Sequence, residues 1–100
     1  MGMTVRLQTS AGTTIASVTE GAVDLSRVLP PFADPAFPYL GLIDPYGDTW
    51  FSSLQMHALL PEIRRLRSSI PEPSGVLMRV EELAQQCAAS VHIFLRFVGD

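Results

Sequence analysis

The stretch Asp-Pro-Tyr-Gly at residues 44–47 constrains the fold more than any other, because it fits a type I turn position by position. The carboxylate of Asp44 can cap the turn, and the ring of Pro45 presets φ at the next position. We expect Gly47 to close the turn at positive φ, where glycine carries no steric cost. The chain must therefore reverse its direction here.

The residues on both sides of this turn favour a β-hairpin. Residues 40–43 precede it and residues 49–51 follow it, and both segments are rich in strand-forming side chains. The pattern predicts a hairpin whose short loop closes through a glycine bulge. Its tip would display Asp44, Tyr46 and Asp48 together.

The length and composition indicate a single domain and exclude several classes of protein. A chain of 100 residues can bury one hydrophobic core without staples. The only cysteine is Cys87, so an internal disulfide and a cysteine-based zinc site are excluded. The net charge of -3 argues against nucleic acid as the main partner. Without a secretory signal or about 20 successive apolar residues, we expect a cytoplasmic protein with no membrane partner.

The first third of the chain predicts two strands, a short helix and an extended segment. Residues 4–9 alternate apolar and polar side chains, and residues 14–19 are rich in β-branched residues, which predicts two paired strands. Residues 24–29 allow one or two helical turns, starting at an acidic residue. Residues 30–38 contain four prolines and should be extended, with Phe32 and Phe37 anchored in the core.

The second half has the periodicity of two amphipathic helices followed by a strand. Pro61 restricts where the first helix can begin, so this helix should begin near Leu59 or kink there. Glu62 falls on its outer face. Ser74 can cap the second helix, in which Leu83 and Cys87 face inward while Arg79 and Gln86 face outward. Residues 91–98 have apolar residues on both faces and are therefore predicted to form a strand that is flanked on both sides. We therefore predict an α+β fold with a four- to five-stranded antiparallel or mixed sheet and two main helices packed on one face.

The residues capable of catalysis do not form a recognisable motif. Cys87 could be a nucleophile beside His57 or His92, but its place in the apolar stripe of a helix favours burial in the core. The two histidines show no metal-ligand spacing, so we expect no metal and no cofactor. Glu81 and Glu82 are adjacent on a helix, which is typical of a solvated face.

Two surfaces are candidate binding sites. The first comprises Asp44, Tyr46, Asp48 and Trp50, because a rigid turn that presents aromatic side chains is typical of binding hot spots. The alternative is that these carboxylates only hold the turn and that Trp50 belongs to the core. The second is a basic patch of Arg64, Arg65 and Arg67 on the first long helix, which would attract an acidic partner or a phosphate.

Several short motifs resemble those of a set of small uncharacterised proteins of actinobacteria and other high-GC bacteria. They are Ile-Asp-Pro-Tyr-Gly-Asp-Thr at residues 43–49, with Phe51 and Leu-Gln at 54–55, and Leu-Arg-Phe-Val-Gly-Asp at 95–100. Trp50 and Ser52 depart from the smaller apolar residue and the Asn expected there. All seven basic residues are Arg, which agrees with a GC-rich genome. The resemblance implies no activity.

The sequence thus favours a non-enzymatic protein that binds another protein, as an adaptor, an inhibitor or an immunity-like protein that neutralises a toxin. One alternative is a small-molecule-binding protein or enzyme with a cleft near Asp44, Asp48 and His57. Another is a homo-oligomer in which an apolar sheet edge, with the C-terminal strand as the candidate, pairs with itself.

Overall fold

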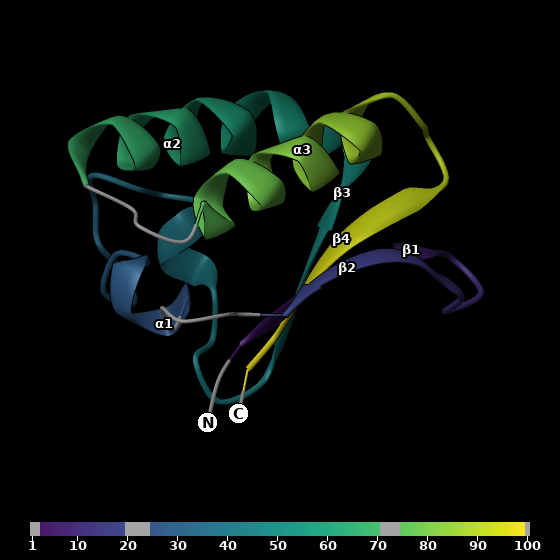
Figure 1. Ribbon diagram of the computed structural model, residues 1–100, viewed down its shortest axis with the longest axis horizontal. Helices are drawn as coiled ribbons and strands as arrows, with labels where there is room; N and C mark the ends of the chain where they lie inside the picture. The colour runs from purple at the N-terminus through teal and green to yellow at the C-terminus, as the bar shows by residue number, and fades with distance from the viewer. Residues whose placement is uncertain (1–2, 20–24, 71–74, 100) are drawn as a thin grey trace.

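The computed structural model describes residues 3–19, 25–70 and 75–99. Two helices pack on one face of a four-stranded antiparallel sheet (Figure 1), so the predicted α+β class is confirmed. The elements in chain order are β1 (Thr4–Thr9), β2 (Thr14–Thr19), α1 (Leu25–Val28), the 3₁₀ helix η1 (Leu40–Leu42), β3 (Asp48–Ser52), the 3₁₀ helix η2 (Ser53–Gln55), α2 (Met56–Ser69), α3 (Val76–Ala88) and β4 (Ile93–Val98).

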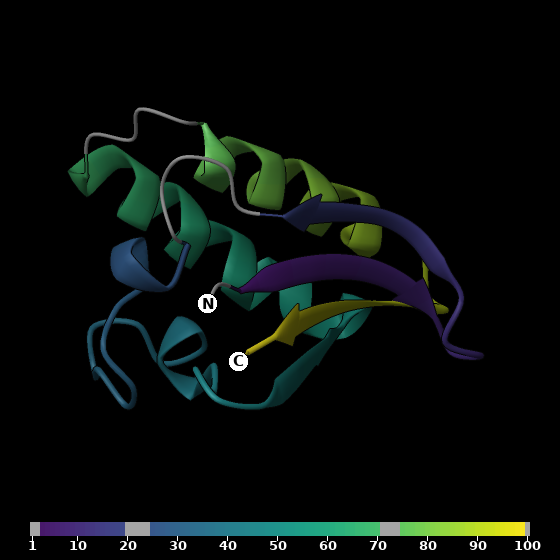
Figure 2. The same ribbon diagram turned by 60° about the horizontal axis from the view of Figure 1, so that its bottom comes forward.

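The strand order is β2-β1-β4-β3, so the last strand in the sequence lies between β1 and β3 and is not the sheet edge that the homo-oligomer alternative assumed. The register pairs Val5 with Val18 of β2 and with Phe97 of β4, which places these three side chains in one row. Because side chains alternate along a strand, this row faces the helices and its neighbours face the other way. Figure 2 shows α2 and α3 on one side of the sheet only, so the prediction that residues 91–98 form a strand flanked on both sides is wrong.

The hydrophobic core lies between this sheet face and the two long helices. Phe51 of β3 and Phe97 of β4 meet edge to face with ring centroids 5.8 Å apart, and both are fully buried. Aromatic pairs prefer such an arrangement. Met56 and Leu59 close the core from α2, and neither is exposed to solvent.

The predicted β-hairpin around residues 44–47 is wrong. Its first arm is not a strand, because residues 40–42 form η1, and β3 pairs with β4 instead. The physical reason is the Glu62 carboxylate, which accepts hydrogen bonds from the N–H groups of Tyr39 (3.1 Å) and Leu40 (2.9 Å). This tertiary contact provides hydrogen-bond acceptors for the backbone N–H groups at the start of η1. It therefore overrides the strand propensity of the segment.

Glu62 itself was expected on the outer face of its helix, and that expectation is also wrong. The residue is 5% exposed and points at the start of η1. A buried carboxylate is tolerated when its oxygens accept hydrogen bonds, and two backbone N–H groups provide them here.

Several element boundaries differ from those predicted. α2 begins at Met56, earlier than Leu59, because η2 leads directly into it and a reciprocal capping box joins Ser52 to Gln55. Pro61 lies inside this helix. α3 follows Gly75, which has a φ of 72°, and the predicted cap Ser74 lies outside the described residues. The predicted helix start at residue 24 also lies outside them, and β4 begins two residues later than expected.

The inward and outward faces predicted for α3 are confirmed. Leu83 and Cys87 are buried, whereas Arg79 and Gln86 are exposed. The Cys87 thiol donates a hydrogen bond to the carbonyl oxygen of Ile93 at 3.4 Å. Burial raises the pKa of this thiol to about 11, which leaves it protonated and unreactive near neutral pH.

We expect Cys87→Ser to lower the free energy of unfolding by about 1–3 kcal/mol, because a hydroxyl in this apolar site costs more to desolvate than a thiol. Denaturant unfolding of both proteins measures the loss. Native wild-type protein should also react slowly with a bulky thiol reagent, and rapid labelling without prior unfolding would contradict the burial.

Candidate functional site

The turn at residues 44–47 forms as the sequence predicts. The Asp44 carboxylate accepts a hydrogen bond from the N–H of Tyr46 at 2.9 Å, and the Asp44 carbonyl accepts a longer one from Gly47 at 3.4 Å. The N–H of Asp44 donates to the Thr49 hydroxyl at 2.9 Å, which ties the turn to the start of β3. The predicted capping role of Asp44 is confirmed.

Gly47 does not adopt the positive φ that we expected. Among the described glycines, only Gly12 and Gly75 do so. A Cβ atom at Gly47 would instead lie 2.8 Å from Oδ2 of Asp44, the end of a flexible side chain that can shift. A side chain here would displace the capping carboxylate.

The turn closes over Gly99, a residue to which the sequence analysis assigned no structural role. The N–H of Gly99 donates to the carbonyl oxygen of Gly47 at 2.6 Å. A Cβ atom at Gly99 would lie 2.6 Å from the Pro45 carbonyl oxygen and 2.7 Å from those of Asp44 and Gly47. Glycine at the end of the central strand is therefore what allows the turn to fold back onto the sheet.

The four residues predicted for the first binding surface lie around one depression. Its volume is about 810 Å³, and its lining residues are Phe32, Leu42, Asp44, Pro45, Tyr46, Asp48, Thr49 and Trp50. The exposed fractions of Phe32, Leu42, Tyr46 and Trp50 are 64%, 56%, 83% and 46%. We call the side chains of Phe32, Leu42, Asp44, Tyr46, Asp48 and Trp50 the turn patch.

Two members of the turn patch were not foreseen. Phe32 was expected in the core but is exposed, whereas Phe37 of the same proline-rich segment packs against the core as predicted. Leu42 was assigned to a strand, and its exposure follows from the 3₁₀ geometry of η1. No local signal in the sequence distinguishes Phe32 from Phe37, because the path of the segment depends on tertiary contacts.

Trp50 is held in place on the sheet face that α2 and α3 leave open. Its ring meets the ring of Phe94 edge to face, with centroids 6.2 Å apart. The Arg96 guanidinium lies 4.9 Å from the Trp50 ring centroid and forms an ion pair with Asp48. Arg96 also donates to the side-chain oxygen of Gln8 at 3.3 Å. These contacts fix both the indole and the Asp48 carboxylate.

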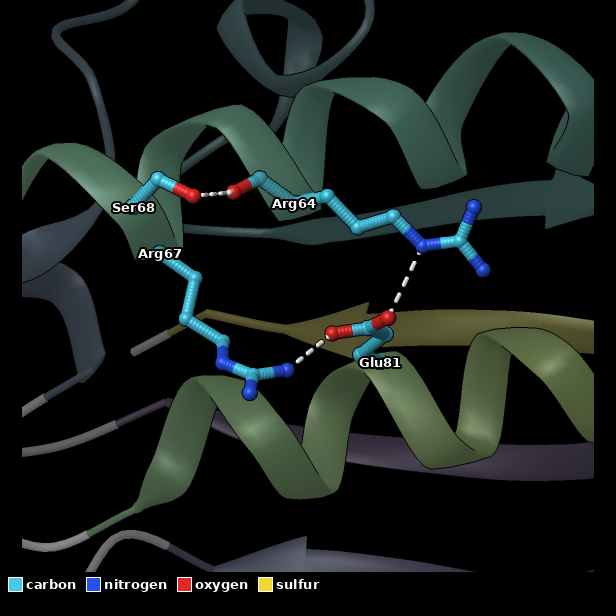
Figure 3. Close-up of polar contacts among 4 residues, drawn as sticks. All are labelled: Arg64, Arg67, Ser68 and Glu81. Carbon is cyan, nitrogen blue, oxygen red and sulfur yellow. Dashed lines mark hydrogen bonds and ion pairs between the residues drawn. The ribbon is translucent and has the colours of Figure 1, made fainter.

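The basic patch is engaged in contacts within the chain. Figure 3 shows Arg64 and Arg67 of α2 reaching Glu81 of α3. Glu81 is 8% exposed, which corrects its prediction as part of a solvated face. The hydrogen bond from Arg64 lowers the pKa of Glu81, and Arg67 adds to the effect, while desolvation opposes it. These charges stabilise the contact between the two helices.

The third basic residue, Arg65, is also engaged. Its guanidinium donates to the carbonyl oxygen of Ala36 and lies 4.6 Å from the centroid of the Phe37 ring. Arg65 therefore fastens the proline-rich segment to α2 through a hydrogen bond and a cation–π contact.

The polar residues of the alternative cleft are not brought together. His57 is exposed on α2 and is not among the residues that line the depression with Asp44 and Asp48. His92 is exposed before β4. In residues 3–19, 25–70 and 75–99, no group of three or more His, Cys, Asp or Glu side chains could hold a metal ion.

Comparisons of the chain with protein-family models, curated proteins and solved structures found no match. None of the described helices combines the length and apolar character needed to cross a bilayer. The function must therefore be inferred from the geometry of the site.

Proposed function

We propose that this chain is a non-enzymatic protein-binding module that meets its partner through the turn patch. The observation that carries the proposal is the convergence of four exposed apolar side chains on one depression, namely Phe32, Leu42, Tyr46 and Trp50. Contiguous apolar patches rimmed by polar groups are typical of interaction sites, and Tyr and Trp are enriched among binding hot spots.

The rigidity of the patch favours binding at low entropic cost. Asp44 caps the turn that carries Tyr46, and Phe94 and Arg96 hold the Trp50 ring. Side chains fixed before association lose little freedom when they are buried. The depression is thus prepared for a partner without rearrangement.

The charge of the patch defines the partner that fits it. Two carboxylates, Asp44 and Asp48, line the depression, and because Arg96 already forms an ion pair with Asp48, Asp44 carries the open negative charge. The complementary surface is apolar with basic groups at its rim. Such a partner is consistent with a role as an adaptor, an inhibitor or an immunity-like protein. The resemblance to proteins of high-GC bacteria supports a bacterial cytoplasm as the place where the protein acts.

Once a partner is purified from the native host, Tyr46→Ala should weaken its binding by about 2 kcal/mol, because the ring would be a central anchor. Stability should hardly change, since this position of the turn accepts most residues. Calorimetric titration of the partner with each variant measures the loss.

Leu54→Ala is the matched control, because Leu54 is 75% exposed but does not line the depression. It should bind like the wild type. Wild-type affinity for both Tyr46→Ala and Asp48→Ala would rule out the turn patch, and a loss on His57→Ala instead would favour the enzyme or small-molecule alternative.

A further inference from the structure

β3 forms one of the two edges of the sheet. The strand order places β4 on one side of it, and no strand of the described chain pairs with its other side (Figure 2). The register of β3 with β4 is continuous from Asp48 to Ser52. By contrast, the opposite edge strand, β2, pairs through a bulge at the register shift between Leu7 and Gln8 of β1. Bulges protect sheet edges, and β3 lacks one.

The hydrogen-bond pattern identifies the backbone groups on the outer side of β3. Gly99 donates to the carbonyl oxygen of Gly47, so this pair begins the bonded series with β4. Bonded and non-bonded pairs alternate in an antiparallel ladder, so the backbone groups of Asp48, Trp50 and Ser52 point outward. The Ser52 N–H is occupied by the side-chain oxygen of Gln55 at 2.7 Å.

The outward backbone N–H and C=O groups of Asp48 and Trp50 could therefore form hydrogen bonds with a further strand. Within the described residues, no hydrogen bond engages the outward N–H and C=O groups of these two residues. Both residues also line the depression of the turn patch, together with Thr49 between them. A chain that paired with this edge would run along the depression.

We propose that the partner contributes an extended segment that adds to the outer edge of β3 as a fifth strand. This inference rests on the proposed function and specifies the form of the partner. Alternate side chains of the added strand would enter the depression beside Leu42 and Phe32, and the backbone would bond to Asp48 and Trp50.

The chemistry of the depression selects a segment of alternating apolar and basic residues from another protein. The apolar side chains match Phe32, Leu42 and Trp50, and a basic one matches Asp44, because Asp48 already forms an ion pair with Arg96. A second copy of this chain fits less well, because β3 reads Asp-Thr-Trp-Phe-Ser and supplies a carboxylate but no basic residue. Self-pairing through β3 would therefore bring no basic side chain to Asp44.

Two blocked octapeptides provide the first test, one alternating Arg and Val and the other alternating Glu and Val. We expect the Arg-Val peptide to bind at least tenfold more tightly than the Glu-Val peptide. Since Trp50 is the only tryptophan, its fluorescence reports this binding directly. Saturating Arg-Val peptide should also slow hydrogen exchange at the Trp50 N–H, because an added strand would bond to it. This readout requires no variant.

A matched pair of substitutions at Trp50 separates the contribution of its backbone N–H to peptide binding from the contribution of its side chain. Trp50→Ala and Trp50→Pro both lose the indole, but only proline removes the outward N–H. We expect Trp50→Pro to bind a fluorescently labelled Arg-Val peptide about tenfold more weakly than Trp50→Ala. Ser17→Pro and Ser17→Ala apply the same change to an outward position of β2 and should bind alike. Circular dichroism checks that each variant is folded.

Equal binding by Trp50→Pro and Trp50→Ala, or no protection of the Trp50 N–H at saturation, would overturn strand addition. Failure of the Arg-Val peptide to bind, or no preference over Glu-Val, would overturn the chemistry proposed for the segment. A dimer in sedimentation that Trp50→Pro abolishes would make a second copy the occupant. In each case the proposed function stands if Tyr46→Ala still weakens partner binding, and it fails separately if Tyr46→Ala has no effect.

Discussion

Gly99→Ala should lower the free energy of unfolding by about 3 kcal/mol, because its added methyl group has no space. A Cβ atom there would lie 2.6–2.7 Å from three backbone carbonyl oxygens, those of Asp44, Pro45 and Gly47. Backbone atoms cannot move aside as a flexible side chain can, so the turn would have to lift from the end of β4. Denaturant unfolding measures the change.

Gly12→Ala is the matched control for this prediction. Gly12 has a φ of 89° but no atom within 4 Å of its would-be Cβ, so alanine there meets backbone strain without collision. We expect a loss of about 1 kcal/mol at this position. A Gly99→Ala variant no less stable than Gly12→Ala would show that the turn is not held against Gly99. If the loss is as predicted, binding through the turn patch should also weaken.

Glu62→Leu should also lower the free energy of unfolding, by about 2–4 kcal/mol. Leucine has a similar volume but cannot accept hydrogen bonds, so the N–H groups of Tyr39 and Leu40 would be left buried without a partner. The start of η1 would then separate from α2, and Leu42 would leave the turn patch. Thermal and denaturant unfolding both measure the loss of stability.

Two further variants identify the cause of that loss. Glu62→Gln retains one side-chain oxygen as an acceptor and should cost less than Glu62→Leu. Glu82→Leu removes an exposed carboxylate from α3 and should change stability by less than about 0.5 kcal/mol. Equal stability of Glu62→Leu and the wild type would contradict the role of Glu62 in fixing η1.

The regular elements were predictable because their periodicity reflects which face is buried. The alternation of residues 4–9 located β1, and the helical spacing of Leu83 and Cys87 identified the inward face of α3. Residues 40–43 were assigned wrongly because their propensity is local, whereas their conformation is set by Glu62, more than 20 residues away in the sequence. Propensity is a weak guide wherever such a tertiary contact decides.

The candidate site was predictable only where local sequence patterns determine it, and not where tertiary contacts do. Turn chemistry alone placed Asp44, Tyr46 and Asp48 together on the surface, and the structure places Trp50 beside them. Phe32 comes from a segment without regular structure, so its position depends on how the proline-rich chain is fastened by Arg65 and Glu62. The steric role of Gly99 depends on the approach of two distant backbones, which no local pattern encodes.

Hydrogen exchange of the complex with its purified partner tests the central claim most directly. Amide protons that the partner covers exchange more slowly than in the free protein, and each region reports separately. We predict that the strongest new protection falls on residues 42–50, with little change at the outer face of α2. Protection centred on Arg64 and Arg67, or on the turn of α2 that carries His57, with residues 42–50 unchanged, would contradict the assignment of the turn patch as the binding site.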